Sequence, residues 1–203
     1  MGKFLSICLY LSGFVVPELN ELFLENISSF SDMGISEKRR LFRIFSQISL
    51  GKKPYEDIIH NLEENGLILS LSDTLENQIS GGIKIISPEA VELINELSAD
   101  FEVIGISDYP SHWINPLQKE LSRVNLPFNN IFMTDQMNLG NLGSDLIDWL
   151  KGRNESALDS WLWIDANPKR SMYALSVGIN SVIYVDIRRL RRELIMRKML
   201  PKE

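Results

Sequence analysis

The sequence predicts an α/β protein in which a parallel-sheet core is interrupted by an inserted helical segment. Two observations lead to this prediction. From residue 83 onward, short apolar runs alternate with helical patterns, as is typical of parallel strands joined by crossover helices. Before that, one apolar run over residues 4–11 is followed by a long stretch with helical spacing only. We therefore expect residues 1–16 and 83–203 to form the core, and residues 17–82 to form an inserted α-helical cap.

The composition is consistent with one sizeable core. The chain has 203 residues, of which 44% are hydrophobic and 24% are charged. A formal net charge of -6 gives no general reason to expect nucleic-acid binding. Cys8 is the sole cysteine and cannot form an internal disulfide, which suits the cytoplasmic location that we expect. The two histidines, His60 and His112, are too far apart in sequence to form a metal-ligand pattern.

The first apolar run allows two interpretations. The weakly positive start Met1-Gly2-Lys3 followed by apolar residues 4–16 resembles a secretory signal peptide. However, no small-residue cleavage pattern follows, and the run is too short to span a bilayer comfortably. We therefore interpret "FLSICLYL", residues 4–11, as a parallel strand buried on both faces, and we expect no membrane association.

The inserted segment reads as helical throughout. Apolar spacing predicts helices over residues 18–30, from Ser36 to Gly51 and over residues 54–64, and a short fourth helix before Gly81-Gly82.

The rest of the chain alternates between helix and strand. Ser87-Pro88-Glu89 starts a helix that runs to about Ser98, because a capping serine, a proline and an acidic residue occupy its first turn. The expected strands cover residues 101–107, 130–135, 160–165 and 181–186. The expected helices cover residues 112–124, 143–151 and 168–177, and a last helix extends to about Met199.

Ligands bind at the carboxyl ends of the strands in an open α/β sheet, so the strand ends hold the candidate residues. The first strand ends in "YLSGFV", residues 10–15, the next in Ser107-Asp108, and "SWLWID" in Asp165. With this order of elements, nearly the whole chain resembles the haloacid-dehalogenase-like (HAD-like) superfamily, in its subgroup with a helical cap. The resemblance implies a Rossmann-like core.

Several functional positions of that superfamily are altered here. Its first motif is a strand ending in D-x-D-G; Gly13 is kept, but Tyr10 stands at the nucleophile position and Ser12 at the acid–base position. Ser107 matches the second motif, a strand ending in Ser or Thr. The third motif supplies a lysine, whereas "LGNLGSDLIDWL", residues 139–150, contains none, and Asn141 is the nearest equivalent.

The fourth motif, a strand ending in two aspartates, is half kept. Asp165 and the later Gly178 are present, Ala166 replaces the second aspartate, and Arg170 falls where many relatives have asparagine. We expect no cofactor, or Mg²⁺ at Asp165 if the site is functional. We hypothesise that the Arg170 guanidinium reaches Asp165 and supplies the positive charge that Mg²⁺ supplies in relatives. Alternatively, Asp165 caps the helix that follows.

The altered positions argue against the chemistry of the superfamily. Phosphatases of this kind attack phosphorus with a carboxylate, whereas Tyr10 has an ordinary pKa near 10 and is mostly neutral at pH 7. A serine hydroxyl cannot act as the acid–base group at neutral pH. We therefore expect no catalytic residues, and a non-catalytic binding or regulatory protein. The alternative is a HAD-like hydrolase that acts on a phosphorylated small molecule with altered chemistry, using Tyr10, Ser12, Ser107, Asp108 and Asp165.

Ligand contacts and partners follow from the same positions. The candidate ligand-binding residues are Ser107, Asp108, His112, Trp113 and Arg170. A structural role is the alternative for Ser107, which could cap a turn, and for Trp113, which could pack in the core. The basic segment 187–203 reads as a solvated helix face or as a contact for an anionic partner. The partner is an unknown small molecule or protein, and a homodimer is a further possibility.

Overall fold

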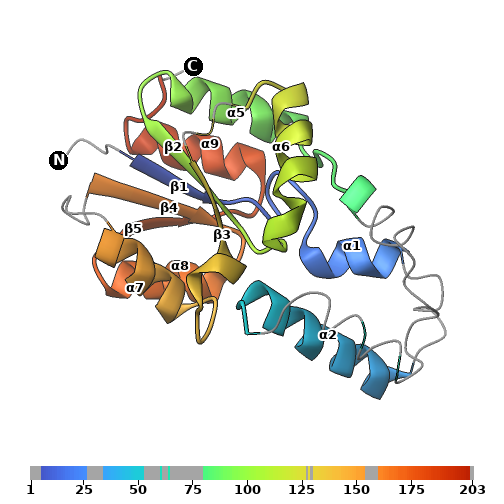
Figure 1. The fold of residues 1–203 in the computed structure, drawn as a ribbon. Coiled ribbons are helices and arrows are strands. Elements are labelled where there is room, and N and C mark those ends of the chain that lie inside the picture. The colour runs from blue at the N-terminus through green and yellow to red at the C-terminus, as the bar shows by residue number, and fades with distance from the viewer. Residues whose placement is uncertain are drawn as a thin grey trace.

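The computed structural model shows a five-stranded parallel sheet between two layers of helices (Figure 1). It describes residues 6–26, 34–52, 60, 64, 80–126, 128, 130–153 and 160–201. The strand order is β3-β2-β1-β4-β5, and every pairing is parallel. The strands are β1 (Ser6–Tyr10), β2 (Glu102–Ser107), β3 (Asn130–Met133), β4 (Trp161–Asp165) and β5 (Asn180–Ile183). The predicted α/β class with a Rossmann-like parallel sheet is confirmed.

The first apolar run forms the central strand β1. It pairs with β2 on one side and β4 on the other, and all five of its residues are buried. Tyr10 is level with Ile106, and Leu9 is level with Ile164. This register brings the carboxyl ends of β1, β2 and β4 together at one edge of the sheet, where the predicted motifs lie.

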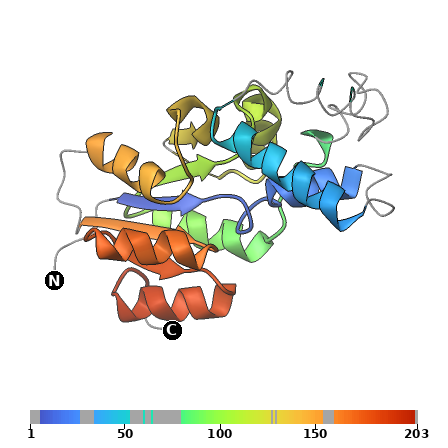
Figure 2. The ribbon, with the colours of Figure 1, turned by 90° about the horizontal axis from the view of Figure 1, so that it is seen from below.

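Helices cover both faces of the sheet (Figures 1 and 2). One face packs against α5 (Pro88–Ser98), α6 (Ile114–Arg123) and α9 (Ile187–Met196), whose buried leucines join Ile7 and Leu9 in one core cluster. The other face packs against α7 (Ser144–Arg153) and α8 (Pro168–Ser176), in a cluster that contains Cys8 and Tyr10. Successive β1 side chains therefore alternate between two cores, as the pleat of a strand requires.

Two helices of the inserted segment lie at the carboxyl edge of the sheet (Figure 1). They are α1 (Leu19–Asn26) and α2 (Ile35–Ser49), which agree with the helices predicted from residue 18 and from Ser36. The helix predicted over 54–64 and the short one before Gly81-Gly82 lie almost entirely outside the described residues. The division of the chain into a core and a cap domain remains a prediction.

The end of α2 is fixed to the core by hydrogen bonds. The Thr134 hydroxyl donates to the Ser49 carbonyl at 2.7 Å, and the Ser49 hydroxyl donates to the Asp108 carbonyl at 3.1 Å. Gly51 then leaves the helix with φ +67°, and a Cβ on it would lie 2.0 Å from the Asp135 carbonyl oxygen. Only glycine fits this close approach of two backbones.

Two strands end earlier than the sequence predicts, and one helix begins differently. The strand predicted over 130–135 stops at Met133, and a 3₁₀ turn over Thr134–Met137 follows, where Thr134 binds α2. The strand predicted over 181–186 stops at Ile183. The helix predicted from residue 112 starts with a 3₁₀ turn over Ser111–Trp113. Of the helices that the structure describes, none has the length and apolar character that a membrane span requires.

Candidate functional site

The ends of β1, β2 and β4 form the floor of a pocket of about 520 Å³. Residues of α1 and α2 and the segment just before α1 form the opposite wall, so the core and the inserted segment both contribute. The lining residues are Tyr10, Ser12, Glu18, Leu19, Ser46, Ser49, Asp108, Leu142, Ala166, Asn167, Pro168, Lys169 and Arg170.

Asp165 and Arg170 form a two-pronged ion pair beneath this pocket. Arg170 Nε donates to Asp165 Oδ2 at 2.5 Å, and Arg170 Nη2 donates to Asp165 Oδ1 at 2.9 Å. The Asp165 side chain is fully buried, and that of Arg170 is 12% exposed. Asn167, rather than Asp165, caps α8, because its side-chain oxygen accepts from the Lys169 amide at 2.9 Å. The guanidinium thus reaches Asp165, as the hypothesis from the sequence requires.

The Asp165 carboxylate has no lone pair left for a metal ion. Its Oδ1 also accepts from the Asn167 amide at 2.8 Å, and its Oδ2 accepts from Trp163 Nε1 at 3.2 Å. Four N–H donors therefore use the roughly four acceptor positions of a carboxylate. A guanidinium cation already neutralises its charge. In the described part of the chain, no three His, Cys, Asp or Glu side chains come together as a metal site. The residues present do not fit Mg²⁺.

Tyr10, which the sequence resemblance predicted at a nucleophile position, is the last residue of β1 and faces Arg170. The guanidinium carbon lies 3.7 Å from the centre of the Tyr10 ring, which is a cation–π contact. Tyr10 is 1% exposed, and its hydroxyl has no hydrogen-bond partner of acceptable geometry. Burial raises the pKa of the Tyr10 phenol well above its ordinary value, and the nearby Asp108 carboxylate raises it further. The neutral phenol is therefore even less able to act as a nucleophile than free tyrosine.

Asp108 has a different environment from Asp165. Its Oδ1 accepts a hydrogen bond from the Ser12 hydroxyl. A residue of the predicted first motif and the residue that follows the second motif therefore meet in the pocket. Burial raises the pKa of the Asp108 carboxyl, while the Ser12 hydrogen bond and the Arg170 charge oppose that shift. No ion pair neutralises Asp108 among the described residues.

Glu18 is a pocket residue that the sequence did not point out. It follows Pro17 just before α1, and its carboxylate lies over the first-motif loop: a Cβ added to Gly13 would be 3.3 Å from Glu18 Oε1. Burial raises the pKa of Glu18, and the negative charges of Glu21 and Asp108 add to this. In the sequence, the one sign of a role for Glu18 is its position shortly after the first motif. The path of the chain between them includes Gly13 with a positive φ of +77°, which the sequence pattern does not show.

Two other motif positions have structural contacts. The buried Ser107 hydroxyl accepts from the Tyr109 amide at 3.2 Å, so it holds the turn after β2. Asn141 Nδ2 donates to Asp145 Oδ1 at 2.7 Å, and Asn141 Oδ1 accepts from the Gly143 amide at 2.8 Å. Asn141 therefore organises the start of α7, and Leu142, its neighbour, lines the pocket instead.

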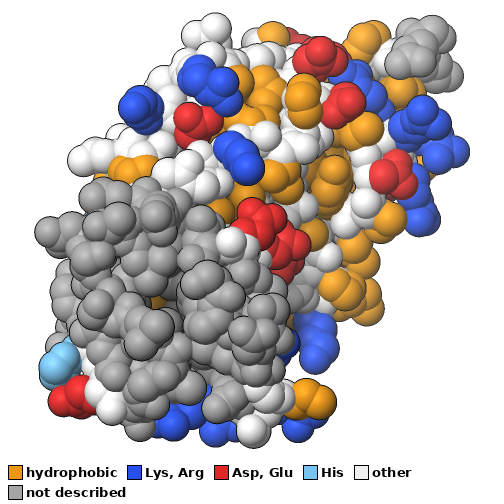
Figure 3. Space-filling model, turned by 90° about the vertical axis from the view of Figure 1, so that its right-hand side faces the viewer, with side chains coloured by type: hydrophobic (Ala, Val, Ile, Leu, Met, Phe, Trp, Pro, Cys, Tyr) orange, Lys and Arg blue, Asp and Glu red, His pale blue; other side chains and the backbone are white. Residues whose placement is uncertain are grey.

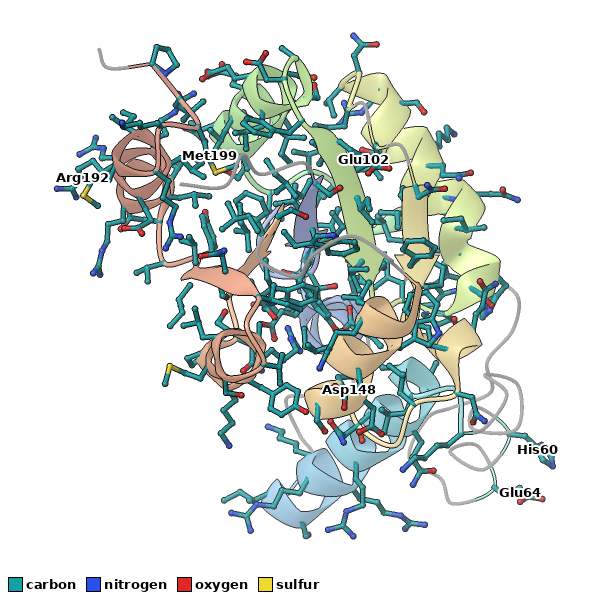
Figure 4. The ribbon with its side chains drawn as sticks, turned by 90° about the vertical axis from the view of Figure 1, so that its left-hand side faces the viewer. His60, Glu64, Glu102, Asp148, Arg192 and Met199 are labelled. Carbon is teal, nitrogen blue, oxygen red and sulfur yellow. The ribbon has the colours of Figure 1, made fainter. Side chains whose placement is uncertain are left out.

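The aromatic and histidine candidates lie outside the pocket lining. Trp113 is buried, and its ring centre lies 6.2 Å from that of Tyr109. His112 is exposed at the surface beside Trp113. His60 pairs with Glu64 at 3.2 Å, on the outer side of the inserted segment and away from the sheet (Figure 4). A ligand-binding role of His112 and Trp113 remains a prediction.

The described surface mixes charges of both signs. On the face that carries α1 and α2, acidic and basic side chains are interspersed over the described part (Figure 3). In the basic segment, Arg191 binds Glu96 through two hydrogen bonds of 2.9 and 2.5 Å, and Arg197 pairs with Glu193. Arg192 projects from α9 away from the core (Figure 4). Part of the predicted basic face is therefore neutralised within the molecule.

One class of fold combines this sheet order with helices inserted after β1 and a pocket at the strand ends. Comparison with solved structures finds the same fold. The chain has the haloacid-dehalogenase-like fold. No family model matches the sequence, and no curated protein matches it.

Three solved structures show the extent of the similarity. One is described as a predicted HAD-like family hydrolase from Porphyromonas gingivalis (16% identity, TM-score 0.68, covering 95% of this chain and 98% of that chain). Another is a HAD family enzyme from Bacteroides thetaiotaomicron (14%, TM-score 0.71, 91% and 95%), which has also been solved with magnesium and inorganic phosphate. A third is an L-2-haloacid dehalogenase from Xanthobacter autotrophicus (14%, TM-score 0.62, 98% and 85%). At these identities the similarity establishes the fold alone.

Proposed function

We propose that this chain is a non-catalytic binding or regulatory protein built on the HAD-like fold. The observation that carries the proposal is the Asp165–Arg170 pair: a buried carboxylate at the fourth-motif strand end is saturated by four N–H donors, two of them from a guanidinium. Arg170 then does permanently what a bound cation does in an active relative, which is to neutralise Asp165. The neutral, buried Tyr10 at the nucleophile position supports the same conclusion.

The test is an assay of phosphate release. The purified protein is incubated with a broad panel of phosphorylated small molecules in the presence of Mg²⁺, of Mn²⁺ and of no metal. We expect release no faster than with a heat-denatured sample. Turnover that Asp108→Asn abolishes, and that the surface substitution Asp100→Asn leaves intact, would contradict the proposal.

One observation favours a second candidate, a hydrolase with altered chemistry. The Ser12 hydroxyl donates to the Asp108 carboxylate inside the pocket, and burial raises the pKa of that carboxyl. A hydroxyl held by a carboxylate resembles a nucleophile beside its general base. In this case Ser12→Ala and Asp108→Asn should each abolish turnover in the same assay, whereas Tyr10→Phe should preserve it.

A further inference from the structure

The pocket floor has an electrostatic character opposite to that of a phosphate site. Asp165 and Arg170 neutralise each other through their paired hydrogen bonds. The lining then keeps two carboxylates, those of Asp108 and Glu18, and one further cation, Lys169, whose side chain is at the exposed start of α8. A phosphoryl group placed on the floor would meet two carboxylates at close range.

The first-motif loop is also poorly prepared to hold an anion. The Gly13 amide donates to the Val16 carbonyl at 2.8 Å, so this N–H is committed within the loop. The Glu18 carboxylate lies over Gly13, on the side where an anion would approach that loop. The residues nearest the third-motif position offer no cation, because Asn141 is bonded to Asp145 and Ser144. The described floor therefore repels anions.

An independent feature of the pocket floor is the hydroxyl of Tyr10. Tyr10 lines the pocket, and its buried hydroxyl lies near the Asp108 carboxylate without a hydrogen-bond partner of ordinary geometry. A buried hydroxyl without a partner is destabilising, so native structures normally satisfy such groups. The Asp108 carboxylate lines the same pocket as Tyr10, so one ligand group bound at the floor lies near both residues.

We propose that the pocket binds small molecules through a positively charged amino group. This inference rests on the proposed non-catalytic binding function and names its ligand class. A primary ammonium carries three N–H donors, and the pocket supplies three acceptor groups: the Asp108 carboxylate, the Glu18 carboxylate and the Tyr10 hydroxyl. The remainder of the ligand lies between the core and α2, where Ser46, Ser49 and Asn167 line a pocket of about 520 Å³.

The experiment measures thermal stabilisation of the full chain by matched probes. The amines are 1,4-diaminobutane and glucosamine, each paired with a neutral counterpart, 1,4-butanediol and glucose. Inorganic phosphate is the anionic probe. We expect each amine to raise the melting temperature in a saturable manner, and the diol, glucose and phosphate to leave it unchanged. Phosphate stabilisation without amine stabilisation, or no saturable effect of either amine, overturns the inference.

Two variants locate the effect in this pocket. Glu18→Gln and Asp108→Asn should each weaken amine binding at least about tenfold, because each removes a charged hydrogen-bond acceptor. Glu25→Gln removes one carboxylate charge from an exposed position of the same helix as Leu19 and should leave the affinity unchanged. Equal affinity in all four proteins overturns the inference.

The two proposals fail in different ways. If amines do not bind and phosphate release is absent, the ligand class is wrong and the non-catalytic function stands. If phosphorylated substrates turn over, the non-catalytic function is wrong whatever the amines do.

Discussion

The ends of β4 and β2 carry two aspartates at the same edge of the sheet, and their environments differ sharply. Asp165 at the end of β4 accepts four hydrogen bonds and pairs with a guanidinium. Asp108 after β2 accepts one side-chain hydrogen bond, from Ser12, and burial raises the pKa of its carboxyl. The first is a completed ion pair, whereas the second lines the pocket and has no ion-pair partner among the described residues. In this chain, the carboxyl edge of the sheet therefore holds one aspartate in a buried ion pair and one aspartate that lines the pocket.

Removing the cation from the β4 end should have the largest effect. Arg170→Ala leaves Asp165 buried with an unpaired charge, a change that costs about 3–5 kcal/mol. The free energy of unfolding, from denaturant titration at pH 7, measures the loss. Arg192→Ala, which removes an exposed arginine of α9, should change it by less than about 0.5 kcal/mol. Similar values for the two variants would mean that the ion pair is not structural.

Disturbing the contact between the end of α2 and the residues that follow β2 should have the next largest effect on stability. Gly51→Ala forces a side chain into a left-handed backbone and against the Asp135 carbonyl, at a cost of about 2 kcal/mol or more. Gly152→Ala is the matched control, since it lies in α7 with nothing within 4 Å, and it should stabilise the protein by about 0.5–1 kcal/mol. Denaturant titration checks both. Equal stability of the two variants would show that α2 is not docked as described.

A third comparison separates the hydrogen bond from Trp163 to Asp165 from the packing of the tryptophan ring. Trp163→Phe removes the indole N–H that donates to Asp165, whereas the indole nitrogen of Trp161, also buried, has no partner. The same substitution at both positions removes similar volume, so the difference between their unfolding free energies reports the hydrogen bond. We expect Trp163→Phe to cost about 1 kcal/mol more. No difference would show that the indole bond adds nothing to the Asp165 cluster.

The smallest expected effect is a pH trend at the β2 end. Because the pKa of Asp108 in the folded protein is raised above its ordinary value of 3.8, folding favours its protonated form. Its contribution to stability is complete below that ordinary value and is lost as pH rises through the raised pKa. Unfolding free energies of wild type and Asp108→Asn, measured from pH 3 upward, should therefore diverge, with wild type losing stability relative to the variant. Parallel curves would mean that the Asp108 pKa is ordinary.

Much of the fold could be predicted because its signals are local. Ser87 accepts from the Ala90 amide at 3.1 Å as its capping position requires, and β1 is as apolar as a central parallel strand must be. The Asp165–Arg170 contact was also predictable, because Arg170 lies in the first turn of the helix that follows the strand ending at Asp165. These features depend on residues close in sequence.

The missed features depend on how distant segments meet. Glu18 lies over Gly13, which turns the chain with a positive φ before α1 begins, and this turn is not visible in the sequence pattern. The 3₁₀ turn at Thr134 follows from its bond to Ser49, 85 positions away in the sequence. The Asn141 side chain donates a hydrogen bond to the nearby Asp145 instead of facing the pocket. Such a local hydrogen bond competes with a ligand-binding role, and a motif match does not reveal it.

A calorimetric titration with Mg²⁺ tests the central claim most directly. If Arg170 has replaced the cation at Asp165, the wild-type protein should show no stoichiometric heat of Mg²⁺ binding at neutral pH. Tight binding of one Mg²⁺ per chain, lost in Asp165→Asn, would contradict the account, because it would require Asp165 to exchange its guanidinium for a metal ion.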